Sequence, residues 1–281
     1  MRQQTFVNNK PTLYLVATPV GNLSEFTPRA IETLKSVSVI GCEDTRTSKT
    51  LLSHFEIDTP LLSYHKFNEK ESVERFIEIL EKGEDIALIS DAGYPLVSDP
   101  GSVLVNEVIK RGFNVTTISG ASAFLNALVS SGFSLSRFTF VGFLDAKSSS
   151  RVKELEELKK NKETLIFYES PHRIEEFLED LIKVFGNRRV VLARELTKKF
   201  EEYVRGTASE VLEVAPSLKG EMVVIVEGNL EKEKTITEEE LVEEIKSMLT
   251  SMSSKEIVAL LTDKYNLKKN YVYDLVCKNK W

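Results

Sequence analysis

Short apolar runs alternate with helical patterns over the first 120 residues of the chain. The apolar runs are bounded by turn residues and lie at 13–20, 38–44, 60–65, 85–90 and 115–119. Between them, segments such as 28–37 and 71–83 carry apolar residues three and four positions apart, which predicts amphipathic helices. This alternation predicts strand–helix–strand units and a largely parallel sheet.

A second series of strands is predicted farther along the chain. Its members lie at 137–144, 164–170, 188–196, 202–207 and 220–228. Several are joined by short turns rather than helices, so the second sheet is predicted to be mixed. Pro171 is well placed as the first residue of the helix that follows the second of these strands. The serine-rich segment 130–137 is the predicted linker between the two halves.

The end of the chain has a different composition. A charged connector over 231–241 contains a helix start at Thr237, and SSKE (253–256) has the spacing of a capping box. Helical stretches are predicted over 240–251 and 255–266, before a short basic run. Residues 245–281 carry seven lysines and three acidic residues. We therefore predict an α/β fold with domains at 1–130 and 131–230 and a small, basic helical module at 231–281.

Composition and charge narrow the class of protein. The 281 residues are 42% hydrophobic and 28% charged, which is typical of a soluble globular protein. Cys42 and Cys277 form no metal-ligand spacing and suit a reducing cytosol. There is no apolar signal core and no membrane-length apolar run, so we expect a cytoplasmic protein without a metal. The net charge of −6 argues against a wholly basic nucleic-acid-binding surface, although not against a local basic patch.

Four loops of unusual sequence follow predicted strands of the first half. They span 17–23, 42–48, 90–101 and 119–123, and they are rich in Gly, Pro, Ser, Thr and Asp. Ligands of open parallel sheets bind beyond the carboxyl ends of the strands, so these loops should converge on one rim. None has a P-loop, GxGxxG or nucleophile-elbow motif. The composition favours a polar, partly cationic small ligand held by backbone groups.

Seven motifs of the chain resemble a known family. They are LYLVATPVGNLSEFTPRAIETL, IGCEDTRTSKTLLSHF, ISDAGYPLVSDPGSVLV, ISGASAFLNALVSSGF, LIFYESPHRI, RELTKKFEEYVRGT and GEMVVIVEG. Together they resemble the bacterial 16S ribosomal RNA cytidine 2′-O-methyltransferases of the tetrapyrrole methylase superfamily. The resemblance implies two α/β/α domains that bind S-adenosylmethionine (AdoMet) in the cleft between them. It also implies that two copies of the chain form a homodimer, as is usual in the family. It also implies methylation of a ribose 2′-hydroxyl in the decoding region, with 16S rRNA or the small ribosomal subunit as partner.

The resemblance also implies a set of cofactor-binding residues. The central loop matches the family at Ser90, Asp91, Ala92, Gly93, Tyr94, Pro95 and Val97. The first loop, Thr18, Pro19, Val20, Gly21 and Asn22, would close one side of the cleft, and the turn after the fifth strand contributes Ala121 and Ser122. The facing wall would be formed by Glu169, Ser170, Pro171, Glu221, Met222 and Val223. Asp99 is expected to cap the following helix instead of binding the ligand.

Methyl transfer to a hydroxyl benefits from a base or a hydrogen-bond acceptor. The candidates are Glu43, Asp44, Glu169 and Glu195, of which Asp44, together with Arg46, ranks first because it lies on the predicted rim. A salt bridge that only orders the rim is the alternative for each of these residues. Candidates for contact with RNA are Arg46, His172, Arg173, Arg194, Lys198, Lys199, Arg205, Lys268 and Lys269, together with stacking faces on Tyr265, Tyr271, Tyr273 and Trp281.

Plainer interpretations remain open for these groups. His172 could serve a helix start or a dimer interface, the lysines could form a solvated surface, and the tail aromatics could be core residues. Two other functions are also open. One is a methyltransferase of the same superfamily that acts on a tetrapyrrole or a protein residue, although such relatives have GxGPG-like first loops. The other is a non-catalytic RNA-binding scaffold, which would have no reason to keep both walls of a cofactor cleft.

Overall fold

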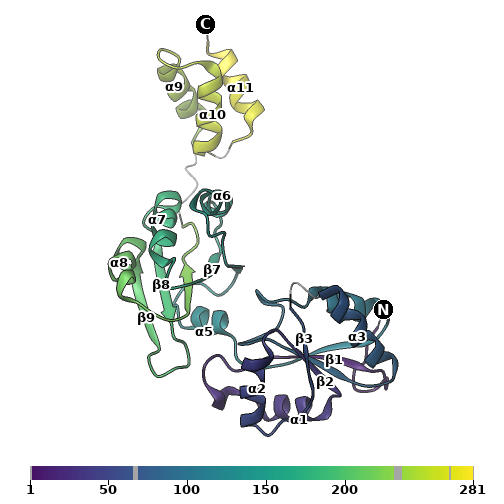
Figure 1. Cartoon of the computed structure of the whole chain (residues 1–281). Coiled ribbons are helices and arrows are strands. Elements are labelled where there is room, and N and C mark those ends of the chain that lie inside the picture. Colours follow the sequence, from purple (N-terminus) through teal and green to yellow (C-terminus); the bar gives the residue numbers. More distant parts are fainter. Residues whose placement is uncertain (1, 66–68, 231–235, 266, 281) are drawn as a thin grey trace. The chain divides into compact units, whose positions relative to one another are not determined.

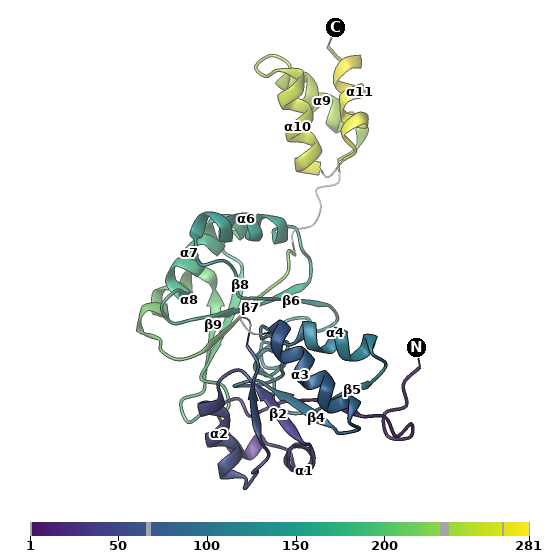
Figure 2. The same ribbon diagram turned by 45° about the vertical axis from the view of Figure 1, so that its right-hand side comes forward.

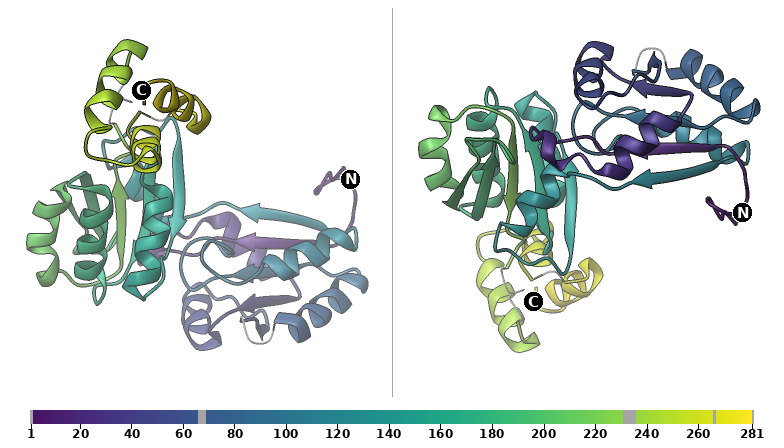
Figure 3. Two further views of the ribbon diagram at one scale, coloured as in Figure 1. Left: turned by 90° about the horizontal axis from the view of Figure 1, so that it is seen from above. Right: turned by 90° about the horizontal axis from the view of Figure 1, so that it is seen from below.

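The chain folds into two compact units, Met1–Asn229 and Leu230–Trp281. The computed structural model describes residues 2–65, 69–230, 236–265 and 267–280. The first unit contains the two predicted sheets, which lie side by side when the molecule is seen from several directions (Figures 1 and 3). No helix among the described residues has both the length and the apolar character needed to cross a membrane.

The first sheet is entirely parallel, as predicted. Its strands are β1 (Thr12–Val16), β2 (Val39–Cys42), β3 (Leu61–Ser63), β4 (Ile86–Ile89) and β5 (Asn114–Ile118). They are arranged in the order β3-β2-β4-β1-β5. Strand β1 pairs with β4 on one side and with β5 on the other. The loops that follow β4, β1 and β5 are therefore neighbours at the carboxyl edge of the sheet.

Helices cover both faces of the first sheet (Figure 2). One face packs against α1 (Pro28–Ser36) and α2 (Thr45–His54), and the other against α3 (Glu69–Glu81) and α4 (Ser102–Lys110). Because β4 is covered on both sides, all four of its residues are buried, as expected of a central parallel strand. Helix α2 is formed by a segment whose residues are mostly polar, TRTSKTLLSH.

The second sheet is mixed, which confirms the prediction. Its strands are β6 (Phe138–Gly142), β7 (Thr164–Glu169), β8 (Arg189–Arg194), β9 (Glu202–Thr207) and β10 (Met222–Val226). They are arranged in the order β6-β7-β10-β8-β9, with β6 parallel to β7 and the other pairs antiparallel. Antiparallel pairing places the end of β7 beside the start of β10, so both contribute to the same edge.

Each face of the second sheet is covered by a different part of the chain. One face packs against α6 (Ser148–Leu158), α7 (Ile174–Phe185) and α8 (Ala208–Val214), which the short 3-10 helix Ala215–Ser217 follows. The other face packs against α5 (Ala123–Val129). Although α5 follows directly after the first sheet in sequence, its buried residues Ala127 and Leu128 belong to the core of the second. This helix ties the two halves together.

One predicted helix start is wrong. Pro171 is not the first residue of a helix, because α7 begins at Ile174 with Arg173 at its N-cap. Residues 171–173 form a turn between β7 and the helix. That turn keeps Ser170 and Pro171 at the edge of the sheet.

The C-terminal unit is built from α9 (Glu238–Met248), α10 (Ser254–Tyr265) and α11 (Lys269–Lys278). The predicted helix start at Thr237 and the capping box from Ser253 to Glu256 are both confirmed. Counted over residues 230–281, nine lysines stand against ten acidic residues. The excess positive charge therefore lies in α11 and its flanking lysines, whereas α10 has as many lysines as acidic residues and α9 is acidic. Trp281 and residues 231–235 of the connector lie outside the described residues.

A buried arginine fixes the chain after β6. The Arg151 side chain is 0% exposed, and its Nη2 lies 2.7 Å from Asp180 Oδ2. Its Nη1 donates to the carbonyl oxygen of Ala146 at 3.1 Å. Removing one partner of such a pair leaves a buried charge without compensation, which is far more harmful than losing an exposed pair.

We expect Asp180→Ala to lower the free energy of unfolding of the protein by about 3–5 kcal/mol. Glu227→Ala is the control, because it removes the partner of Arg189, whose side chain is 65% exposed. That change should cost less than about 1 kcal/mol. Urea unfolding followed by circular dichroism measures both, and equal losses would contradict the structural role of the Arg151–Asp180 pair.

Candidate functional site

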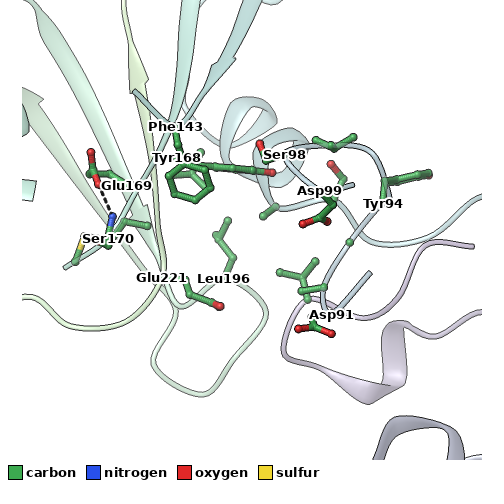
Figure 4. A pocket seen from close by; sticks show the side chains of 18 of the residues that line it. Asp91, Tyr94, Ser98, Asp99, Phe143, Tyr168, Glu169, Ser170, Leu196 and Glu221 are labelled. Atoms are coloured by element: carbon green, nitrogen blue, oxygen red, sulfur yellow. Dashed lines mark hydrogen bonds between the residues drawn. The ribbon is translucent and has the colours of Figure 1, made fainter. Parts of the chain in front are cut away.

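A cavity of about 350 Å³ lies between the carboxyl rim of the first sheet and the edge of the second (Figure 4). The first half contributes Val20, Asp91, Ala92, Gly93, Tyr94, Val97, Ser98, Asp99, Ser122 and Ala123. The second half contributes Phe143, Tyr168, Glu169, Ser170, Pro171, Leu196, Glu221, Met222 and Val223. Its volume falls within the range of small-molecule binding sites.

Backbone hydrogen bonds join the loops after β1 and β4. The Thr18 N–H donates to the Gly93 carbonyl at 2.9 Å, and the Gly93 N–H donates to the Thr18 carbonyl at 3.1 Å. Gly93 has φ of +76°, a left-handed conformation that side chains other than glycine adopt at a cost. Space is not the constraint, because a Cβ at this position would be 3.7 Å from its nearest neighbour. The glycine is needed for the bend that brings the two loops together.

The loop after β4 bends repeatedly before α4 begins. Leu96 and Ser98 have φ of +72° and +68°, and Gly101 has φ of +140°. Left-handed residues other than glycine are uncommon and often mark functional sites. Ser98 and Asp99 reach the cavity through these bends, although they stand well after the strand.

The loop after β5 closes the floor of the site. The Gly120 N–H donates to the hydroxyl of Tyr94 at 3.1 Å. A Cβ on Gly120 would lie 2.9 Å from Cβ of Ala17, so the backbone approaches the first loop too closely for a side chain. Of the predicted cofactor-binding residues, Thr18, Pro19, Ser90, Pro95 and Ala121 are not part of the lining and instead belong to these bracing loops.

Carboxylates gather on the first-half wall of the cavity. Burial, followed by the nearby charges of Glu43 and Asp91, raises the pKa of Asp99 to about 6. Burial and the charge of Asp44 also raise the pKa of Asp91. Within the described part of the chain, the lining contains no lysine or arginine. The interior of the site therefore favours a cationic ligand.

The structure places Asp44 at a helix cap and Asp99 in the cavity lining, where the sequence predicted a helix cap at Asp99. Asp44 is the N-cap of α2, where it accepts from the Arg46 N–H at 2.8 Å and forms an ion pair with the Arg46 guanidinium at 3.0 Å. These hydrogen bonds lower the pKa of Asp44 to about 2. Asp99 does not cap a helix as predicted, because Gly101 is the N-cap of α4. Asp99 lines the cavity instead.

The other acidic candidates lie differently. Glu43 is exposed and not part of the lining, although its charge acts on Asp99. Glu169 is buried, and its carboxylate accepts from the Ser170 N–H at 2.8 Å and lies 3.4 Å from Arg173 Nε. In Figure 4 this carboxylate points away from the ring of Tyr168. Burial raises the pKa of Glu169.

Several of the predicted RNA-binding cations have partners within the protein. Lys198 forms ion pairs with Glu195 at 3.0 Å and with Glu221 at 2.9 Å. Arg194 pairs with Glu202 and donates to the carbonyl of Lys219 at 3.2 Å. Arg173 donates to the carbonyl of Leu144 at 2.9 Å, and Arg205 donates to that of Ser130 at 2.7 Å.

The remaining cationic candidates are accessible to solvent. The Arg46 side chain is 90% exposed, and His172, Lys199, Lys268 and Lys269 are exposed as well. Arg46 is paired with Asp44, whereas no ion pair within the described residues involves His172, Lys199, Lys268 or Lys269. Arg46, His172 and Lys199 belong to the first unit, and Lys268 and Lys269 to the second.

The segment between β8 and β9, residues 195–201, connects the two halves beside the cavity, and we call it the strap. Thr197 Oγ1 donates to the carbonyl of Val20, and Asn22 Nδ2 donates to the carbonyl of Thr197 at 3.2 Å. Leu196, from the same strap, lines the cavity. The cavity is thus closed on this side by contacts between residues far apart in sequence.

Sequence reasoning missed several lining residues, namely Ser98, Asp99, Ala123, Phe143, Tyr168 and Leu196, whereas Val20 lines the cavity as its loop was predicted to do. Most are apolar or aromatic residues next to motifs that were identified. These residues could have been predicted only from their position next to a predicted loop, because their side-chain polarity does not indicate a binding site. No group of three or more His, Cys, Asp or Glu among the described residues could hold a metal ion.

The raised pKa of Asp99 has a consequence for stability. Because the folded pKa exceeds the ordinary value, ionisation of Asp99 disfavours folding, and the penalty develops as pH rises from about 4 to 6. We expect Asp99→Asn to raise the free energy of unfolding at pH 8 by on the order of 1–3 kcal/mol, with little difference near pH 4. Urea unfolding at both pH values measures this, with exposed Asp58→Asn as control. Loss of stability at pH 8 would refute the assignment.

Comparisons with known proteins identify the family. Residues 12–212 match the family model described as tetrapyrrole (corrin/porphyrin) methylases. A solved structure of diphthine synthase covers 78% of this chain and 90% of its own, with a TM-score of 0.59 and 13% identity, which shows the shared fold.

Closer relatives are found among ribosomal RNA small subunit methyltransferases I. The protein of that name from Bacillus subtilis (strain 168) is 44% identical over 287 residues, which cover 98% of each chain. The one from Mycoplasmopsis pulmonis (strain UAB CTIP) is 48% identical over 215 residues, which cover 76% of this chain and 96% of the relative. The chain therefore belongs to the ribosomal RNA small subunit methyltransferase I family, within the tetrapyrrole methylases.

Proposed function

We propose that this protein transfers a methyl group from AdoMet to the ribose 2′-hydroxyl of a cytidine in 16S rRNA. The observation that carries the proposal is the 44% identity with a ribosomal RNA small subunit methyltransferase I over 98% of both chains. The cavity between the sheets supplies a site of suitable size, and all of its lining residues except Glu221, Met222 and Val223 lie within the span matched by the family model.

The residues of the cavity fit AdoMet. Its sulfonium and ammonium groups would be favoured by Asp91 and Asp99, which face no lysine or arginine within the described lining. Apolar groups such as Val97, Leu196 and Val223 would bury the adenosine, as in most small-molecule sites. The polar backbone of the loop 90–97 supplies hydrogen bonds close to Gly93. AdoMet, when bound, supplies a methyl group already activated by its sulfonium.

The protein must then orient the ribose oxygen and accept its proton. Holding reactants in line can supply roughly 7–11 kcal/mol of the barrier. Asp99 is the best-placed acceptor, because it lines the cavity and has a pKa of about 6, close to the operating pH that favours a general base. Asp44 is less suited, since its pKa of about 2 reflects hydrogen bonds that already occupy its carboxylate. Arg46 remains a candidate for phosphate contact.

The C-terminal unit is proposed to assist in RNA binding. The Mycoplasmopsis relative is matched over 96% of its length by 215 residues, about the size of the first unit, Met1–Asn229. That supports placing methyl transfer in the first unit and substrate affinity in α10 and α11. Tyr265 is partly buried in the core of the C-terminal unit, whereas Tyr271 and Tyr273 are 38% and 56% exposed. The homodimer and the cytoplasmic location stay predictions.

The alternatives are less well supported. A non-catalytic scaffold does not require the acid-lined cavity or the bends that form it. Action on a tetrapyrrole or a protein residue is suggested by the description of the family model and by fold neighbours of 13–16% identity, and a shared fold does not specify the substrate.

Purified protein should transfer a labelled methyl group from AdoMet to small-subunit rRNA that lacks the modification. Mass spectrometry of nuclease fragments should locate one 2′-O-methylcytidine.

Isothermal titration should show AdoMet binding at micromolar affinity or better. Gly93→Val should abolish it, because a β-branched residue resists φ of +76°. Methyl incorporation elsewhere, or binding unchanged in the variant, would contradict the proposal.

The combined change Lys268→Ala and Lys269→Ala should weaken rRNA binding and reduce the slope of log Kd against log salt by about 1.5–2, since each phosphate contact contributes nearly one unit. AdoMet affinity should not change. The matched control is Lys35→Ala with Lys82→Ala, two exposed lysines next to the strand starts of the first sheet, at the edge opposite the cavity. Salt titrations of RNA binding by fluorescence anisotropy measure both pairs, and identical slopes would show that the tail does not bind phosphates.

A further inference from the structure

Phe143 is an exposed aromatic residue on the wall of the cavity. Its side chain is 56% exposed, although the residue lines the cavity. Its ring centroid lies 5.4 Å from that of Tyr168, which also lines the cavity (Figure 4). Tyr168 in turn packs against Phe140, and Phe140 against Phe124, at 5.2 and 4.8 Å. One side of Phe143 is therefore backed by a row of rings, while much of its remaining surface is open to solvent.

The backbone before Phe143 is shaped to expose it. The pairing of β6 with β7 shifts register between Phe140 and Gly142, as in a β-bulge. Gly142 has φ of +77°, and a Cβ there would lie 3.2 Å from Ser98 Oγ on the opposite wall. Bulges redirect side chains and are common beside active sites. Without the shift, strand alternation would give the next side chain a different direction.

The turn that follows Phe143 is held firmly. Arg173 Nη2 donates to the carbonyls of Leu144 and Asp145 at 2.9 and 3.2 Å. Arg151 donates to the carbonyl of Ala146 and is itself fixed by Asp180. The two guanidinium groups thus fix consecutive carbonyl oxygens. Because these hydrogen bonds hold the backbone beside Phe143, its exposed ring is preorganised for binding. Preorganisation lowers the entropy cost of binding a partner.

We propose that Phe143 is the platform on which the base of the target cytidine stacks. The inference rests on the proposed function. Proteins that recognise RNA at single-stranded loops and ends commonly stack an unpaired base on an aromatic side chain. Asp91 and Asp99 on the facing wall, together with the nearby Glu43, disfavour a phosphate in this cavity, so the base is the part of the nucleotide that a contact with Phe143 can hold.

The test compares Phe143→Ala, Phe143→Leu and Phe143→Trp in the full-length protein. Stacking on one aromatic ring corresponds to roughly a 5- to 150-fold effect in affinity. We expect Phe143→Ala to raise KM for unmethylated small-subunit rRNA within that range. Phe143→Leu should recover little, because it restores apolar bulk without a π face. Phe143→Trp should return KM close to that of the parent.

Two further measurements separate stacking from a structural role. The Kd for AdoMet, measured by calorimetry, should stay within about twofold in all three variants, which also shows that they fold. The slope of log KM against log salt should not change, since stacking releases no counterions. Phe200→Ala is the control, because Phe200 is 67% exposed but does not line the cavity, and it should leave KM unchanged.

Other results would overturn the inference. If Phe143→Ala weakened AdoMet binding while leaving KM for rRNA unchanged, the ring would cover the donor instead of the base. If Phe143→Leu behaved like the parent, apolar contact would suffice and stacking would be refuted. Unchanged KM in Phe143→Ala would refute it as well. Failure of the proposed function is separate, because the parent protein itself would then transfer no methyl group to rRNA.

Discussion

The paired hydrogen bonds between Thr18 and Gly93 are the constraint on which the site depends. They join the loops after β1 and β4, two neighbouring strands of the first sheet. Once these loops are joined, the chain from Gly93 to Gly101 must turn back several times before α4 begins. Those turns place Ser98 and Asp99 on the wall of the cavity. A residue with a Cβ at position 93 would therefore disturb the cavity wall as well as its own conformation, because the position of the wall depends on the Thr18–Gly93 hydrogen bonds.

Much of the fold could be predicted because hydrophobic periodicity reports directly on strands and helices. The parallel first sheet, the mixed second sheet and the helix caps at Thr237 and Ser253 all follow from such local patterns. The partner of α5 could not be predicted, since an apolar helix face does not specify which sheet it will cover. Its residues Ala127 and Leu128 join the second core although the helix emerges from the first sheet.

The site was predicted less completely, and the reasons are physical. The loop 90–97 and the turn at Ser122 were identified from composition and resemblance, and most of their residues do line the cavity. Asp99 was predicted to be a helix cap and lines the cavity instead, because a cap is defined by where its helix begins. Left-handed residues at Leu96, Ser98 and Gly101 delay the start of α4, and such conformations have no clear sequence signal outside glycine. Phe143 was missed because a register shift sets its direction.

The negative charge of the cavity requires that, in the proposed reaction, the cofactor and the RNA phosphates bind at different places. A cavity that attracts a sulfonium through Asp91 and Asp99 must repel the phosphates of the RNA that it modifies. Contacts to phosphate are therefore expected outside it, on exposed cations such as Arg46, whereas the base and ribose enter. Arg46 is held at the rim by Asp44, so the same ion pair that weakens Asp44 as a base keeps a cation at the boundary. An uncharged aromatic contact inside that boundary is compatible with both demands, because a π face holds a base without attracting its phosphate.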